Sequence, residues 1–222
     1  MTADGIAPRE FHAAEGAEDW RVLAEGACAF FRTTSLAEST RLIAAIAEVP
    51  GIEDHRPDID VRGDGVTVRL ITIAEDWYGP TRRDLELARR ISATVRHLGF
   101  AADASTLQSF LVIPGAPNTA EVMPFWRAVL GYEPRGDSPD EDLVDPRMRG
   151  PSFWFEPMEQ PRPDGGGAIH VAVWVAPEQA EARVAAALAA GGRLVRAVAP
   201  SWWTLADAAG NEADIATTEG RG

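Results

Sequence analysis

The chain has 222 residues, of which 45% are hydrophobic and 25% charged, so it is long enough for one large domain or two small ones. Its formal net charge of −13 argues against nucleic acids and anionic membranes as partners, because both bind basic patches. No apolar run approaches the roughly 18–20 residues of a membrane span and no signal peptide is evident, so we expect a cytoplasmic protein.

The first part of the chain has the pattern of an antiparallel sheet with helices on one face. Residues 1–17 show no clear period and are predicted to be a mobile tail, followed by a domain over 18–100. Ser35 and Thr81 are suited to cap its two helices. Cys28, the single cysteine, excludes an internal disulfide and is expected to be buried. The expected strands are 20–23, 27–34, 59–61 and 66–70, and the expected helices are 36–47 and 82–98.

After a predicted linker at 101–106, residues 107–217 form a second domain in which one pattern occurs twice. The pattern is a strand, a helix and three strands. The first copy is 107–113, 120–130, 132–135, 142–144 and 152–156, and the second is 169–175, 177–190, 193–198, 202–206 and 212–216. Residues 218–222 are predicted to be a second tail. The predicted fold class is therefore α+β with two domains, the second built from paired βαβββ modules.

The second domain contains three informative passages: a helix end, a helix and a closing hairpin. They read Phe125-Trp-Arg-Ala-Val-Leu-Gly-Tyr, Glu181-Ala-Arg-Val-Ala-Ala-Ala-Leu-Ala-Ala-Gly-Gly and Trp202-Trp-Thr-Leu-Ala-Asp-Ala-Ala-Gly-Asn-Glu-Ala-Asp-Ile. These passages resemble the vicinal-oxygen-chelate (glyoxalase/bleomycin-resistance) superfamily. The resemblance covers about half of the chain and implies that the paired modules curl into a cup.

In that superfamily, ligands converge from the first and last strand of each module. The matching positions here are Gln108, Glu156, His170 and Asp214. One imidazole, two carboxylates and an amide would suit a divalent metal such as Zn, Ni, Fe or Mn, which would polarise a carbonyl or stabilise an oxyanion. In the alternative interpretation these residues line a pocket without metal, and His170 is simply a hydrogen-bonded histidine of the sheet.

Three stretches of the first domain carry a second pattern: Asp54-His-Arg-Pro-Asp-Ile-Asp-Val, Val66-Thr-Val-Arg-Leu-Ile-Thr-Ile and Gly79-Pro-Thr-Arg-Arg-Asp-Leu-Glu-Leu-Ala. They resemble pterin-4a-carbinolamine dehydratase, which implies three histidines that remove a pterin hydroxyl by acid/base catalysis. His55 matches the first of them, but Arg56 and Ile73 stand at the other two. Arginine stays protonated and isoleucine carries no titratable proton, so the match puts ordinary dehydration in doubt.

Other residues of the first domain leave alternatives open. Glu75, Asp76 and Tyr78 would either supply replacement acid/base groups or belong to a solvated loop. Arg56 is a candidate clamp for an anion or carbonyl beside His55. Asp84 is expected only to favour the start of its helix, because an acid there suits the helix dipole.

These observations lead to three functional hypotheses. The first is a non-redox enzyme of lyase, isomerase or cyclase type acting on a polar or cyclic metabolite, mainly in the cup through Glu156, His170 and Asp214, with His55 and Arg56 marking a second pocket. The second is a protein that sequesters a small ligand without turnover. The third is a 4a-hydroxytetrahydropterin dehydratase, with a scaffold role for the first domain as a further alternative. We expect a homodimer.

The binding hypothesis depends on the tryptophans of the second domain. Trp154, Trp174, Trp202 and Trp203 are predicted to belong to the core or to a pocket wall. Their indole rings would suit a flat or apolar ligand, although large aromatic side chains also bury readily without one.

Overall fold

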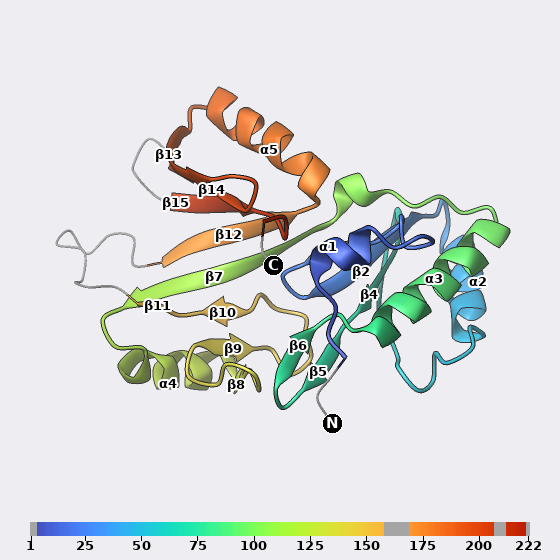
Figure 1. The fold of residues 1–222 in the computed structure, drawn as a ribbon, viewed down its shortest axis with the longest axis horizontal. Helices are drawn as coiled ribbons and strands as arrows, with labels where there is room; N and C mark the ends of the chain where they lie inside the picture. The colour runs from blue at the N-terminus through green and yellow to red at the C-terminus, as the bar shows by residue number, and fades with distance from the viewer. Residues whose placement is uncertain (1–3, 158–168, 207–211, 221–222) are drawn as a thin grey trace. The chain divides into compact units, whose positions relative to one another are not determined.

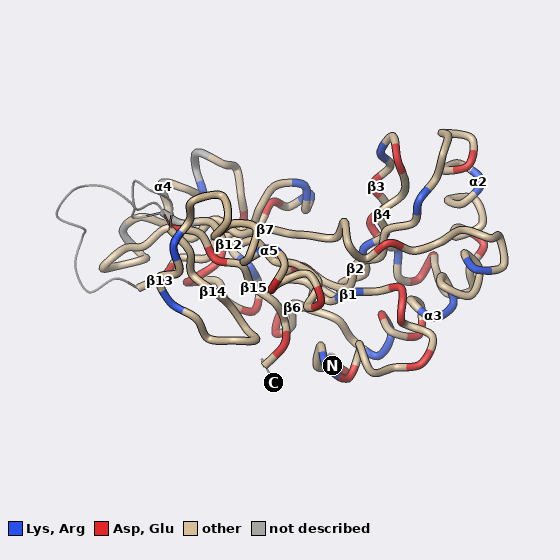
Figure 2. The backbone as a smooth tube through the Cα atoms, turned by 90° about the horizontal axis from the view of Figure 1, so that it is seen from above, with Lys and Arg blue, Asp and Glu red and all other residues tan. Residues whose placement is uncertain are grey.

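The chain forms two units, one built from the residues up to Leu107 and one from Gln108 to Gly220 (Figure 1). The computed structural model describes residues 4–157, 169–206 and 212–220, except for the side chains of residues 121, 125, 128, 129, 169 and 170. None of the helices within these ranges has the length and apolar character needed to cross a membrane. Acidic residues and arginines are interspersed along both units (Figure 2).

The first unit contains a four-stranded antiparallel sheet in the order β1 (Arg21–Leu23), β2 (Gly26–Arg32), β4 (Gly65–Leu70), β3 (Asp58–Arg62). The helices α2 (Leu36–Ala47) and α3 (Arg82–His97) pack on one face of this sheet, and Ser35 and Thr81 cap them as predicted. Alternate residues of the strands enter the core, including Ala29 and Phe31 of β2. The predicted strands and helices of this unit are therefore confirmed.

The N-terminal residues pack into the first unit. Ile6 and Phe11 are 2% and 0% exposed and belong to its core, and residues 8–12 form the short helix α1 (Pro8–His12). Gly5 forms a β-bridge with Thr81. The prediction of a mobile tail is therefore wrong for residues 4–17, because five helical residues are too few to show a period in the sequence.

The segments that follow each domain, residues 101–106 and 218–220, also differ from their predicted structure. Residues 101–106 were predicted as a linker, but Ala102 pairs with Phe31 and the 3₁₀ turn Ala104–Thr106 packs beside β2, so they belong to the first unit. Residues 218–220 were predicted as a tail, but Thr218 is buried and the Glu219 carbonyl accepts a hydrogen bond from Ser201. Hydrogen bonds and a backbone bridge keep these segments in place. Such contacts leave no periodic pattern of hydrophobic residues in the sequence, so the segments could not be recognised there.

A further hairpin occurs where the sequence suggested a loop. It consists of β5 (Thr72–Ala74) and β6 (Trp77–Gly79), with Glu75 and Asp76 exposed at its turn. Its three residue pairs are too few for alternation to be recognised in the sequence. The hairpin leads directly into α3 and brings Thr72 beside the first turn of that helix.

The second unit is a single sheet made of two βαβββ modules, as predicted. The antiparallel pair of β7 (Gln108–Ala116) and β12 (Ile169–Val175) joins the modules at the centre. The predicted strand at 152–156 is two short strands that are interrupted at Phe155. The other elements are α4 (Thr119–Leu130), β8 (Glu133–Pro134), β9 (Asp142–Val144), β10 (Phe153–Trp154), β11 (Glu156–Pro157), α5 (Pro177–Ala189), β13 (Arg193–Val198), β14 (Trp202–Ala206) and β15 (Glu212–Ala216).

The strand register divides this sheet into two faces. Both helices cover one face, where α4 packs with Phe153 and Phe155 and α5 packs with Val175 and Leu205. The alternate residues lie on the opposite face, which we call the cup face. Its described members include Ser109, Leu111, Trp154, Glu156, Ala172, Trp174, Trp202, Thr204, Asp214 and Ala216.

Candidate functional sites

The cup face carries a polar pair at the centre of the second module. Thr204 on β14 lies directly opposite Asp214 on β15, and Asp214 is in register with Ala172 on β12. On the next row, Trp202 pairs with Ala216, which is in register with Trp174. The Thr204 hydroxyl and the Asp214 carboxylate therefore lie two residues along their strands from the level of the Trp202 and Trp174 indole rings. Small alanine side chains fill the same levels of the sheet.

Two hydroxyls of the cup face are buried without a hydrogen bond to any described residue. Thr204 is 3% exposed, and neither its Oγ1 nor the buried Oγ of Ser109 has a hydrogen-bond partner among the described residues. A buried polar atom that lacks a partner costs about 1–3 kcal/mol. A ligand with polar atoms at these positions would recover that free energy, so the cup face is suited to a ligand with both polar and flat apolar parts.

The structure separates Gln108 from the other predicted metal ligands. Gln108 pairs with Val175 and so lies on the helix-covered face, where its Oε1 accepts a hydrogen bond from Arg183 of α5 at 3.2 Å. Ser109 takes the place on the cup face that the sequence analysis gave to Gln108. The physical reason is the two-residue period of a strand, because a shift of one residue moves a side chain to the other face.

The remaining predicted ligands come from three different strands of the sheet. Glu156 is on the cup face in register with Gly115 of β7, and Asp214 lies on the far side of both central strands. The backbone of His170 pairs with Ile113, but its side chain lies outside the described residues. Within the described ranges, no three His, Cys, Asp or Glu side chains lie close enough together to hold a metal. The described side chains therefore do not make up a metal site by themselves, and the side chain of His170 is not among them.

The four predicted pocket tryptophans divide between the two faces. Trp154, Trp174 and Trp202 are on the cup face, where Trp154 is 40% exposed and Trp174 is 8% exposed. Trp203 is on the opposite face and packs against the core beneath α5. Adjacent residues of a strand point to opposite faces, so Trp202 and Trp203 cannot line the same pocket.

Asp142 is a buried carboxylate that the sequence analysis did not single out. It pairs with Trp154 and so belongs to the cup face of the first module. Burial raises the pKa of its carboxyl group. The hydrogen bond from the Ser138 hydroxyl and the positive charge of Arg135, whose Nη2 lies 3.0 Å from Oδ2 of Asp142, partly oppose that rise. Its position at the start of a short predicted strand gave no signal, because only the β9–β10 pairing brings it beside Trp154.

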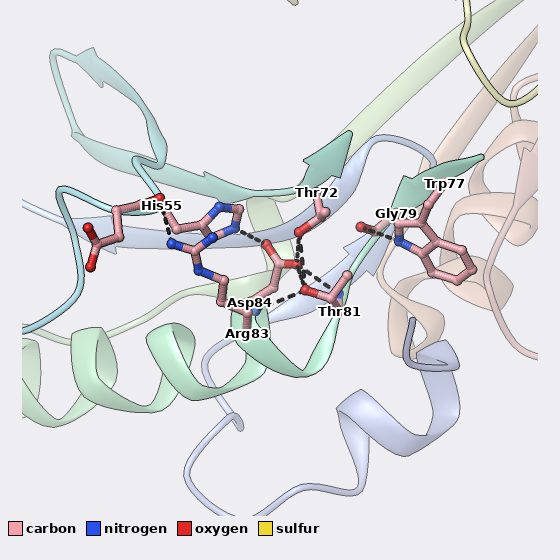
Figure 3. A network of polar contacts seen from close by, with 8 residues as sticks. His55, Thr72, Trp77, Gly79, Thr81, Arg83 and Asp84 are labelled. Atoms are coloured by element: carbon pink, nitrogen blue, oxygen red, sulfur yellow. Dashed lines mark hydrogen bonds and ion pairs between the residues drawn. The ribbon is translucent and has the colours of Figure 1, made fainter. Parts of the chain in front are cut away.

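The first unit holds a second cluster around His55. The Nε2 atom of His55 lies 2.6 Å from Oδ1 of Asp84, which is fully buried in the first turn of α3 (Figure 3). His55 lies on the turn before β3, and Arg83 ties that turn to α3 by donating a hydrogen bond to the Asp54 carbonyl at 2.5 Å. His55 was predicted from the sequence as a site residue, whereas Asp84 was expected only to favour the start of its helix.

Asp84 accepts hydrogen bonds from His55, the Thr72 hydroxyl, and the Thr81 hydroxyl and backbone N–H. Burial raises the pKa of Asp84, but these donors outweigh burial, so the pKa is lowered and the group is an anion near neutral pH. A carboxylate only accepts hydrogen bonds, so Nε2 of His55 carries the proton of this contact. In a neutral imidazole, Nδ1 is then the proton acceptor.

The other predicted residues of the first unit do not join this pair. Arg56 forms an exposed ion pair with Glu53, and its side chain is 77% exposed. Ile73 is 55% exposed on β5, while Glu75 and Asp76 are exposed at the hairpin turn. Among the described residues, His55 is therefore the only one of the predicted acid/base groups that contacts Asp84.

Comparisons with known proteins agree with both resemblances. Residues 6–94 match the family model described as pterin 4 alpha carbinolamine dehydratase, and residues 111–216 match the model described as a glyoxalase-like domain. No curated protein matches the chain.

Solved structures that are similar to about half of the chain include the following two. One is described as an NAD-dependent benzaldehyde dehydrogenase from Legionella pneumophila, with 14% identity, 49% of this chain and 97% of that chain covered, and a TM-score of 0.37. The other is a glyoxalase/bleomycin resistance protein/dioxygenase superfamily member from Vibrio splendidus 12B01, with 17% identity, 50% and 99% coverage, and a TM-score of 0.34.

Proposed function

Because the chain fuses a domain of the pterin 4 alpha carbinolamine dehydratase family to a glyoxalase-like domain, we propose that it is a non-redox enzyme of lyase, isomerase or cyclase type. Its substrate would be a polar or cyclic small molecule. The reaction would take place mainly on the cup face of the second unit. Both families support a small-molecule enzyme or binding protein, and the particular chemistry is our proposal.

The observation that carries this proposal is the Thr204–Asp214 pair. The Thr204 hydroxyl is buried and makes no hydrogen bond to a described residue, and it lies opposite a carboxylate on the neighbouring strand. Such a pair would bind a substrate oxygen through the hydroxyl and accept a proton from the adjacent carbon or oxygen through the carboxylate. Lyases and isomerases need that combination of orientation and proton transfer.

Other residues of the cup face would assist. Glu156 offers a second carboxylate on β11, and Trp174 and Trp202 would exclude water from the substrate. His170 remains a predicted catalytic residue whose side chain lies outside the described residues.

Deuterium incorporation tests the proposal directly. Cyclic α-hydroxy ketones in D₂O would be incubated with wild-type protein, Asp214→Asn, Thr204→Val and Gln108→Ala, and followed by NMR. We expect wild-type protein to catalyse exchange or conversion and Asp214→Asn to slow it by about 10²-fold, the usual contribution of a general base. Gln108→Ala is the control because Gln108 lies on the opposite face. Equal rates for Asp214→Asn and wild type would refute the role of Asp214.

The alternative function is ligand binding without turnover, and the three tryptophans of the cup face favour it. Trp154, Trp174 and Trp202 offer stacking surfaces from three different strands. Flat aromatic probes would quench their fluorescence stoichiometrically in this case. Trp202→Phe would reduce the quenching, whereas Trp203→Phe would leave it unchanged. Quenching without conversion of any probe would support binding over catalysis.

A second alternative is dehydration of a 4a-hydroxytetrahydropterin by the first unit, and the His55–Asp84 contact favours it. It would have to proceed with one histidine, since Arg56 is paired with Glu53 and Ile73 has no titratable group. Turnover of this substrate by wild type but not by His55→Gln would support it. Absence of turnover in both would restrict the proposed chemistry to the cup face.

We also propose that the protein is a homodimer. The proposal rests on the resemblance of the first domain to pterin-4a-carbinolamine dehydratase, because members of that family commonly form oligomers. Sedimentation velocity over a range of micromolar concentrations would distinguish a dimer from a monomer of 23.9 kDa.

A further inference from the structure

Thr72 contacts the buried carboxylate of the first unit from the hairpin side. Its Oγ1 donates to Oδ2 of Asp84 at 2.7 Å and lies 3.1 Å from Oγ1 of Thr81 (Figure 3). Thr72 is the first residue of β5 and pairs with Gly79 of β6. The residue therefore reaches Asp84 from an element that belongs neither to the His55 turn nor to α3.

The two oxygens of Asp84 have different partners. Oδ2 accepts from the Thr72 hydroxyl at 2.7 Å, the Thr81 hydroxyl at 2.6 Å and the Thr81 N–H at 2.7 Å, while Oδ1 accepts from His55 at 2.6 Å. Each hydroxyl has a single proton to donate. Both threonine protons are thus used on Oδ2, which fixes the rotation of the carboxylate and leaves Oδ1 for the imidazole.

From this geometry we infer that Thr72 is a positioning residue for His55. By holding Oδ2 of Asp84, it directs Oδ1 at Nε2–H of His55, so that the imidazole keeps one orientation and presents Nδ1 as the proton acceptor. No other described residue hydrogen-bonds to His55 through a side chain. The inference concerns the first unit and does not depend on the function proposed for the cup face.

The role of Thr72 can be tested separately from the helix-capping role of Thr81. Thr81 caps α3 and forms a reciprocal capping box with Asp84, so its replacement would also weaken the helix start. Thr72 is not one of the two residues that form this box, although its hydroxyl donates to the same Oδ2 atom of Asp84. A change at Thr72 therefore tests the orientation of Asp84 while the capping contacts remain.

The experiment is ¹⁵N-edited NMR of the histidine side chains in the full-length protein. The Nε2–H resonance of His55 is assigned by its loss in His55→Gln. We expect a slowly exchanging, downfield Nε2–H signal in wild type. In Thr72→Val this signal should move upfield and exchange with solvent about tenfold faster, the effect of losing one hydrogen bond to a charged group. Thr72→Ser, which keeps the hydroxyl, should restore the wild-type signal.

Thr33→Val is the control, since Thr33 is a buried threonine of the first unit whose hydroxyl contacts another side chain, the hydroxyl of Ser39 at 2.7 Å. It should lower stability without moving the His55 resonance. The inference is overturned if Thr72→Val leaves the shift and exchange rate unchanged, or if Thr33→Val changes them equally. Should Thr72→Val fail to fold, Thr72→Ala makes the same comparison and is judged by the same outcomes.

Discussion

The Nε2 atom of His55 and the Oδ1 atom of Asp84 are 2.6 Å apart although 29 positions separate the residues in the chain. The contact joins the turn before β3 to the first turn of α3 and buries the carboxylate completely. Because three further donors surround Asp84, the carboxylate orients the histidine and does not itself take up a proton near neutral pH.

Asp84 should make the stability of the first unit depend on pH in the acid range. Its pKa lies below the ordinary value of 3.8, so its contribution is complete above that value and is lost as pH falls through the folded-state pKa. Asp84→Asn should lower the free energy of unfolding by about 3 kcal/mol at neutral pH and by progressively less in acid. Urea unfolding at several pH values measures this.

The control for this experiment is Asp58→Asn, because Asp58 is a largely exposed partner of Arg69. Its effect should stay within about 1 kcal/mol at neutral pH. If the difference in unfolding free energy between wild type and Asp84→Asn stays constant from neutral pH into the acid range, the proposed anionic state of Asp84 is contradicted.

Gln108 should be dispensable for any metal that the protein binds. Its amide contacts Arg183 on the helix-covered face, so Gln108→Ala should change stability by no more than about 0.5 kcal/mol, as for an exposed substitution. Metal content would be measured by plasma mass spectrometry after purification without chelators or metal columns, for wild type, Gln108→Ala and His170→Ala. Metal that disappears in Gln108→Ala would show that the register described for β7 is wrong.

Trp203 and Trp202 should differ in their effects on folding. Trp203 packs against the core beneath α5, so Trp203→Ala should cost about 3 kcal/mol of unfolding free energy. Trp202 lies on the cup face, and its replacement should cost less but reduce the fluorescence response to flat aromatic probes. Urea unfolding and fluorescence titration of both variants test the pair, and the reverse ranking would argue against the assigned faces.

The N-terminal segment should be required for the stability of the first unit. Phe11 is fully buried in its core, so Phe11→Ala should lower the free energy of unfolding by about 3–5 kcal/mol. Leu36→Ala is the control, since Leu36 is 75% exposed and its loss should have little effect. Thermal unfolding monitored by circular dichroism suffices, and unchanged stability of Phe11→Ala would mean that residues 4–17 do not pack as described.

The prediction that Cys28 is buried is met only in part. Cys28 was expected to be buried, and it is partly exposed on the sheet face opposite the helices. Burial of the thiol nevertheless raises its pKa to about 12, with Arg69 opposing and Glu25 adding to the shift. An apolar neighbourhood in sequence thus predicted the thiol's environment but not the side of the sheet on which it lies.

The sequence by itself determined the strands and helices that have clear periods. The expected strands at 59–61 and 66–70 correspond to β3 and β4, and the repeated pattern of a strand, a helix and three strands predicted the paired modules. These elements were predictable because local spacing and capping chemistry specify them. Residues 4–17 and the β5–β6 hairpin escaped prediction because their stability comes from contacts with distant residues.

Only the tertiary structure decided which side chains share a site. Strand register, which depends on pairing between β7 and β12, placed Ser109 rather than Gln108 on the cup face. The approach of the His55 turn, β5 and α3 gave Asp84 its partners, since nothing in the spacing of these residues indicates that they meet. Local patterns specify the elements, whereas the position of each functional side chain depends on how those elements pair and pack.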